Sequence, residues 1–170
     1  NRSVTAMADD FFLEPLKMQQ LAAAQELRDC NDFTAQFGLR LSEPQVQTLV
    51  AARFEALKAT GRMELGEGIL KKLIIAFCDS PYLTQENYED TLLGLQESFY
   101  YFKNESEDRI PDDDLIAILH RLFHGAAQGS IDYLSGTLLE DLCRNTRYGY
   151  ATEDDGDRYA SPFEARDERI

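Results

Sequence analysis

The segment 69–104 constrains the fold more than any other part of this chain. Residues 69–77 are almost all apolar and predict a short buried helix. Pro81 follows a break in the pattern, because the residue before a proline avoids helical geometry. From about Gln85 to Asn104, apolar residues recur at spacings of four and three, as they do along one stripe of a helix. The residues of this stripe are Tyr88, Leu92, Leu95, Phe99 and Phe102.

This long helix has apolar or small residues on more than one side. Leu93 and Tyr100 form a second apolar line, well round the helix from the first stripe. Thr91, Gly94 and Ser98 lie on another side, where small residues let a neighbouring helix come close. A helix that needs neighbours on several sides lies in the middle of a bundle. We therefore predict that it is the central helix of the fold.

Helical spacing and end signals recur along most of the remaining chain. Ser42 and Gln45 have the spacing of a capping box, and Thr84 and Ser130 are expected caps of later helices. Two adjacent strands are not predicted anywhere. The predicted helices cover residues 13–37, 42–60, 69–77, 85–104, 112–124 and 130–145.

The sequence therefore predicts an all-α protein, a compact bundle of about six helices with an acidic C-terminal tail. Residues 1–12 are expected to form an N-terminal extension, 13–145 the helical domain and 146–170 the tail. The acidic composition of the tail alone suggests disorder. Its aromatic residues leave open a second hypothesis, in which they anchor the tail on the bundle or on a second copy of the chain. With 170 residues, the chain suits one domain with a sizeable core.

The charge balance argues against polyanionic partners. The chain has 31 acidic residues against 17 basic ones, a formal net charge of -14 and an isoelectric point near 4.5. Nucleic acid is bound mainly through Lys and Arg side chains that neutralise phosphates, and anionic membrane surfaces attract the same residues. We therefore expect no nucleic-acid partner and no membrane association. A protein partner or self-association remains open.

The cysteines and the N-terminal sequence indicate a cytoplasmic protein. Cys30, Cys78 and Cys143 form no CxxC pair and fall beside apolar helical positions, as buried reduced thiols do. Residues 1–6 lack the apolar core of a signal peptide, and Met7 is a candidate natural start. No stretch of the sequence has the length and apolar character of a membrane span.

His120 and His124 are the only histidines and lie four residues apart on a predicted helix. This spacing puts both imidazoles on one face, as a zinc or iron site requires. The residue after the first histidine is Arg121, however, where a metalloprotease HExxH motif has its glutamate. No spacing nominates a third ligand, so the pair is a weak metal candidate and we expect no metal or other cofactor.

A second candidate site is an anion site at the start of a predicted helix. Gly66 and Gly68 precede the helix, and Lys71 and Lys72 follow within its first turn. Backbone N–H groups at a helix start, together with lysines, can hold a phosphate. The P-loop pattern GxxxxGK[ST] is absent and Glu67 lies inside the loop, so glycines that only turn the chain are the commoner interpretation.

No catalytic constellation is visible. The acidic link after Asn104 fails as a calcium loop, since Arg109 occupies the position of the required glycine and Leu115 that of the bidentate glutamate. There is no GxSxG elbow and no convincing cysteine–histidine pair. Carboxylate pairs such as Glu64 with Glu67 would act as acid and base only if burial separated their pKa values.

Surplus tyrosines provide the remaining candidate surface. The run 99–102 places aromatic residues on several faces of the long helix, and further tyrosines occur near the tail. Amphipathic aromatic side chains are favoured at protein interfaces. The residues of this candidate interaction surface are Tyr100, Tyr101, Tyr148 and Tyr150.

Two strings of the sequence resemble a known family. These are AFCDSPYLT at residues 76–84 and FYYFKNES at residues 99–106. They are similar to a bacterial family of uncharacterised small helical proteins, over residues 11–144. The resemblance implies a bacterial cytoplasmic protein and carries over no catalytic or binding residue.

Two functions follow as hypotheses. The first is a non-enzymatic protein-interaction module that uses exposed aromatic side chains and the tail. The alternative is an enzyme, or a domain that binds a metal or a small phosphate-bearing ligand, with a pocket near residues 66–72 or near the histidine pair. The alternative requires these residues to converge on one cavity.

Overall fold

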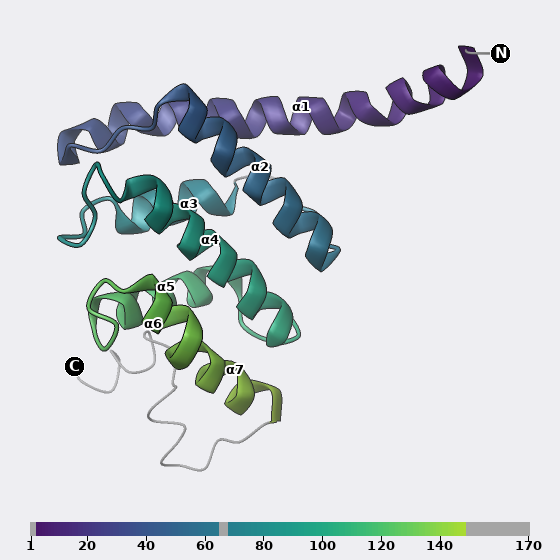
Figure 1. The fold of residues 1–170 in the computed structure, drawn as a ribbon. Coiled ribbons are helices and arrows are strands. Elements are labelled where there is room, and N and C mark those ends of the chain that lie inside the picture. Colours follow the sequence, from purple (N-terminus) through teal and green to yellow (C-terminus); the bar gives the residue numbers. More distant parts are fainter. Residues whose placement is uncertain (1–2, 65–67, 149–170) are drawn as a thin grey trace.

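The computed structural model describes residues 3–64 and 68–148, and all regular secondary structure in these two ranges is helical (Figure 1). The prediction of an all-α fold is confirmed. The helix called α6 runs through a π-helical turn into α7 without a break, so these three segments correspond to the sixth predicted helix. The bounds are α1 (Ser3–Thr34), a 3-10 turn (Ala35–Phe37), α2 (Glu43–Thr60), α3 (Ile69–Phe77), α4 (Tyr88–Glu105), α5 (Asp112–His124), α6 (Ile131–Tyr133), the π-helical turn (Leu134–Leu138) and α7 (Leu139–Tyr148).

Helix α4 is the central helix, as predicted. It packs against α2, α3, α5, α6 and α7. All five residues of its predicted stripe are buried, with at most 1% of their surface exposed. On the side of the small residues, Gly94 faces Ile131, and a Cβ added at Gly94 would lie only 2.4 Å from Ile131 Cγ2. Thr91 and Ser98 are buried on the same side. Small residues therefore let α6 approach α4 closely.

The start of α4 differs from the prediction. The helix begins at Tyr88, three residues later than Gln85. Thr84 N donates to Asn87 Oδ1 at 2.9 Å, and Asn87 N donates to Thr84 Oγ1 at 3.3 Å. This reciprocal pair closes a separate turn ahead of the helix. The prediction that Thr84 caps α4 directly is therefore wrong.

Helix α1 is longer than predicted. It begins at Ser3 and not at Leu13, so Pro15 lies in its interior and the helix crosses the expected boundary at residue 12. Its N-terminal half projects beyond the other helices (Figure 1). Near its other end, Asn31 donates to Leu41 O at 2.9 Å and accepts from Leu41 N at 2.8 Å. These two bonds tie the chain after α1 back onto the helix.

The predicted helix ends near α2 are confirmed. Ser42 and Gln45 form a complete capping box, with each side chain bonded to the backbone N–H of the other residue. Gly61 ends α2 with a left-handed φ of 63°, a conformation that favours glycine. Gly38 ends the 3-10 turn after α1 in the same way, with a φ of 76°.

The π-helical turn changes which leucines face the core at the end of the bundle. The sequence spacing placed Leu134, Leu138 and Leu142 on one line. A π turn inserts one residue into the helical repeat, so the buried positions after it shift by one. Leu134, Leu139 and Leu142 are accordingly buried. Ser130 caps α6 as predicted, since its hydroxyl accepts a hydrogen bond from Tyr133 N.

One buried polar side chain on α4 has an unsatisfied atom. Gln96 is 1% exposed, and its Oε1 has no hydrogen-bond partner in the described part of the chain. A buried carbonyl oxygen without a partner costs about 1–3 kcal/mol. We expect Gln96→Met, which conserves the shape and removes the polar atoms, to raise the free energy of unfolding by about 1 kcal/mol in urea denaturation. A loss of stability would show that the amide oxygen has a hydrogen-bond partner in the protein, such as a buried water.

Candidate functional site

The ligand-binding candidates from the sequence lie in different parts of the fold. Gly68 lines a cavity between α1, α2 and the start of α3, whereas Lys71 lines a groove between α1 and α3. His120 and His124, at the end of α5, line neither. Gly66 lies outside the described residues. The alternative hypothesis, which requires these residues to converge on one cavity, stays a prediction.

The histidine pair joins α5 to the turn after α3. The two rings lie 4.2 Å apart, centroid to centroid. His124 Nδ1 lies 2.7 Å from His120 O, and His124 Nε2 lies 2.7 Å from Ser80 Oγ. Because a carbonyl oxygen only accepts, Nδ1 is the donor to His120 O, and Nε2 shares a second hydrogen bond with the Ser80 hydroxyl. Both ring nitrogens of His124 are thus engaged. Within residues 3–64 and 68–148, no three His, Cys, Asp or Glu side chains gather into a metal site.

The N-terminus of α3 already holds two carboxylates of the chain itself. Glu26 Oε1 accepts a hydrogen bond from Gly68 N at 3.1 Å, and Glu64 Oε1 accepts one from Ile69 N at 2.9 Å. These N–H groups are among those that would bind a phosphate at this helix start. Lys72 pairs with a carboxylate of α5 at 3.0 Å. A phosphate at the predicted anion site would have to displace two glutamates.

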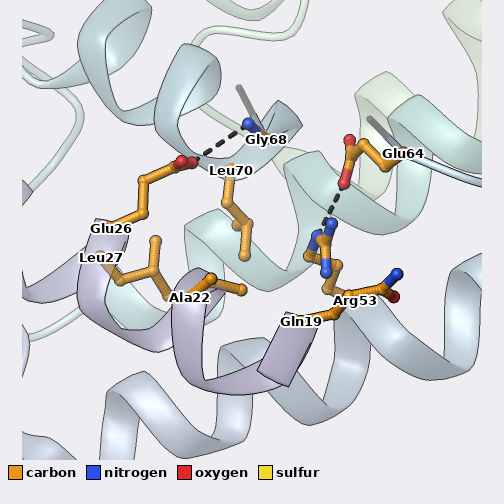
Figure 2. Close-up of a pocket in the computed structure, with 9 residues that line it drawn as sticks. Gln19, Ala22, Glu26, Leu27, Arg53, Glu64, Gly68 and Leu70 are labelled. Atoms are coloured by element: carbon orange, nitrogen blue, oxygen red, sulfur yellow. Dashed lines mark hydrogen bonds and ion pairs between the residues drawn. The ribbon is translucent and has the colours of Figure 1, made fainter. Parts of the chain in front are cut away.

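Glu64 is the centre of a buried polar network (Figure 2). Its Oε2 accepts from Arg53 Nε at 2.6 Å, and its Oε1 accepts from the Tyr100 hydroxyl at 2.8 Å as well as from Ile69 N. The side chains of Arg53 and Glu64 are 13% and 10% exposed. Burial, reinforced by the adjacent carboxylate, raises the pKa of Tyr100 well above its ordinary value. Tyr100 therefore remains a neutral donor, and the network fixes the segment between α2 and α3.

One residue of the predicted aromatic surface is buried inside the fold. Tyr100 is 2% exposed, so the prediction that it contributes to an interaction surface is wrong. Its hydroxyl reaches Glu64, which follows α2, and this bond satisfies the polar end of a buried ring. Tyr101 is 47% exposed, as an interaction residue requires. The side chain of Tyr148 and the whole of Tyr150 lie outside the described residues.

A larger apolar surface lies in the groove between α1 and α3. The groove has a volume of about 360 Å³. Phe33 of α1 and Ile75 of α3 line it and are 48% and 49% exposed, while Cys30 and Ile74 form its buried floor. Large apolar side chains that line a groove and remain half exposed mark an interaction site more clearly than scattered ones do. We call these four residues with the flanking Glu26, Asp29 and Lys71 the α1–α3 groove.

Sequence spacing did not identify this groove. Phe33 follows Cys30 by three residues, a helical spacing that suggests a core position. Ile75 made its helix apolar on nearly all sides, and the sequence gives no sign of which side lacks a neighbour. Phe37 lies seven residues after Cys30, which is also a helical spacing, but it is 41% exposed because α1 ends at Thr34 and the chain turns away.

Fold and surface together define an all-α protein with an apolar groove between two of its helices. A family of unknown function (DUF6323) matches residues 26–152. Because this match covers most of the chain, the protein belongs to that family. The prediction of a family without an assigned activity is confirmed. No match to the chain was found among curated proteins or solved structures.

Proposed function

We propose that this protein is a non-enzymatic protein-interaction module whose α1–α3 groove binds a partner protein or a second copy of the chain. The observation that carries the proposal is the pair Phe33 and Ile75, each about half exposed on the same apolar groove. Burying a side chain of this size contributes about 1.5–3 kcal/mol, and aromatic or aliphatic anchors in a groove are typical interaction hot spots.

The shape and charge of the groove favour an amphipathic helical segment as its ligand. Two helices form the groove walls, and an apolar helix face fits such a site. Glu26 and Asp29 flank the groove with one lysine, Lys71. Since the whole chain carries a formal charge of -14, basic residues around the apolar face of the partner would speed association and favour the correct partner. The same charge supports our proposal that nucleic acid is not a partner.

The described cysteines support a cytoplasmic setting for this role. Cys30 and Cys78 are both buried, and Cys78 is a free thiol. Burial, together with the charge of Asp79, raises the pKa of the Cys78 thiol, so this cysteine is poorly reactive. Free buried thiols are common in reducing compartments. In the described residues, no helix is both long and apolar enough to cross a membrane.

Photo-crosslinking in cells that naturally make the protein tests the proposal. We expect p-benzoylphenylalanine in place of Phe33 to give one recurrent protein adduct, whose mass identifies a partner or a second copy. Tyr133 of α6 is the matched control position, because it is aromatic and 46% exposed against 48% for Phe33. The probe at Tyr133 should not give this adduct.

A second substitution tests whether the Phe33 adduct depends on binding in the α1–α3 groove. Ile75 is 49% exposed, so Ile75→Glu should leave the fold intact while placing a charge in the groove. We expect it to reduce the Phe33 adduct at least about tenfold, which corresponds to about 1.4 kcal/mol. Identical adducts from both probe positions, or an adduct that Ile75→Glu leaves unchanged, would contradict the proposal.

A further inference from the structure

A separate cavity lies between α1, the C-terminal half of α2 and the segment that follows α2. Its volume is about 340 Å³, near the lower end of the range of about 300–1,000 Å³ for small-molecule sites. It has no lining residue in common with the α1–α3 groove. A ligand here would therefore be independent of the interaction proposed above.

Arg53 gives this cavity a fixed cationic group. Its Nε is bonded to Glu64, but no described residue accepts a hydrogen bond from its two Nη atoms. Glu64 also accepts hydrogen bonds from Tyr100 and Ile69, so the carboxylate is held in place and in turn holds the guanidinium. A guanidinium with two free Nη atoms matches the planar, two-oxygen geometry of a carboxylate. Arg53 is therefore held in a fixed position in which it can bind an anion.

The charged side chains that line this cavity are mostly basic, which is unusual for this acidic protein. Arg53, Lys58 and Arg62 line the cavity, and the one acid that lines it is Glu64. Arg62 is paired with Asp108, whereas Lys58 has no ion-pair partner in the described ranges. The chain as a whole has 31 acids and 17 bases, so a concentration of basic side chains is the exception on its surface. This local balance attracts an anion and repels a cation.

The rest of the lining is apolar. Leu16 of α1 and Phe54 and Leu57 of α2 form the walls, and Met63, after α2, closes one side while remaining 79% exposed. Methionine adapts its shape to irregular apolar ligands. A small inorganic anion would leave these walls in contact with water. A ligand with an apolar tail would cover them.

We propose that this cavity binds a medium-chain carboxylate, with the carboxylate on the Nη atoms of Arg53 and the alkyl chain against Leu16, Phe54 and Leu57. Gln19 of α1 lines the same cavity and, together with Arg53, also lines the adjoining cavity of Figure 2. The Gln19 amide supplies a further hydrogen-bond donor for the head group. The cavity volume of about 340 Å³ limits the tail to medium length.

Isothermal titration calorimetry of the full chain with octanoate tests this site. We expect saturable binding with a Kd below about 1 mM. Octyltrimethylammonium, which has the same tail and the opposite charge, should bind at least about tenfold more weakly. Butyrate, which has the same head and a shorter tail, should also bind more weakly. Equal affinity for octanoate and the cation, or no saturable octanoate binding, would overturn the proposal.

Two matched variants locate the binding. Gln19→Glu places a carboxylate in the cavity lining that Gln19 shares with Arg53 and leaves both residues of the Arg53–Glu64 pair in place. Gln19 is exposed, so the fold should persist. We expect it to weaken octanoate binding at least about tenfold. Gln25→Glu makes the same charge change on the same helix, outside the cavity lining, and should bind octanoate as the wild type does. Equal binding by the two variants would show that octanoate binds elsewhere and would refute the assignment.

Discussion

Replacing Glu64 by leucine is expected to lower the free energy of unfolding by about 3–5 kcal/mol, because it removes one partner of a buried ion pair. Leucine cannot accept the hydrogen bonds that Glu64 receives from Arg53, Tyr100 and Ile69. Arg53 would then be a charged group with 13% of its side chain exposed and no counter-ion. Urea denaturation followed by far-UV circular dichroism measures the loss.

An exposed ion pair of the same chain provides the control. Arg28 and Glu43 pair at 2.5 Å, with side chains 34% and 56% exposed. The hydrogen bond from Arg28 lowers the pKa of Glu43 from 4.5 to about 2, so the pair stabilises the fold above pH 4.5 and this contribution is lost as the pH falls towards 2. At pH 7, Glu43→Gln should cost far less than Glu64→Leu, because solvent screens the exposed pair. Equal losses would show that the Glu64 network is not a principal stabilising feature.

The buried faces of α4 could be predicted from the sequence, because the spacing of apolar residues along a helix indicates which side is buried. Each residue of its stripe is buried, and Gly94 marks the side where α6 comes close. Spacing is less informative where a side-chain bond competes with the helix. Thr84 and Asn87 bond to each other's backbone and delay the start of α4. The register change at the π-helical turn likewise has no signature in the apolar pattern.

The candidate sites were harder to predict, because each depends on residues that meet from distant parts of the sequence. Glu26 and Glu64 both accept hydrogen bonds from N–H groups at the start of α3. Their positions in the sequence give no indication of these contacts. Tyr100 has the amphipathic character of an interface residue, but Glu64 accepts its hydroxyl hydrogen bond inside the fold. The groove around Phe33 arises from how α1 crosses α3, which residue spacing within either helix does not determine.

The second large effect is expected at Gly94, where a side chain would force α4 and α6 apart. A Cβ at this position lies 2.4 Å from Ile131 Cγ2 and 3.3 Å from Ile131 Cβ. Ile131 is branched at Cβ, so its Cγ2 cannot move away without a change of rotamer or a shift of α6. We expect Gly94→Leu to lower the free energy of unfolding by about 3 kcal/mol, the upper end of the usual cost of overpacking. Chemical denaturation measures this change.

Gly136 provides the matched control, because a Cβ there meets nothing within 4 Å and the residue is exposed. Gly136→Leu should therefore cost little, and the better helix propensity of leucine would offset part of any loss. Adding Ile131→Ala to Gly94→Leu should recover part of the lost stability, since it removes the atoms that clash. Such recovery is a coupling between the two positions that independent sites would not show. If Gly94→Leu were as stable as Gly136→Leu, α6 would not pack against α4 as closely as the fold requires.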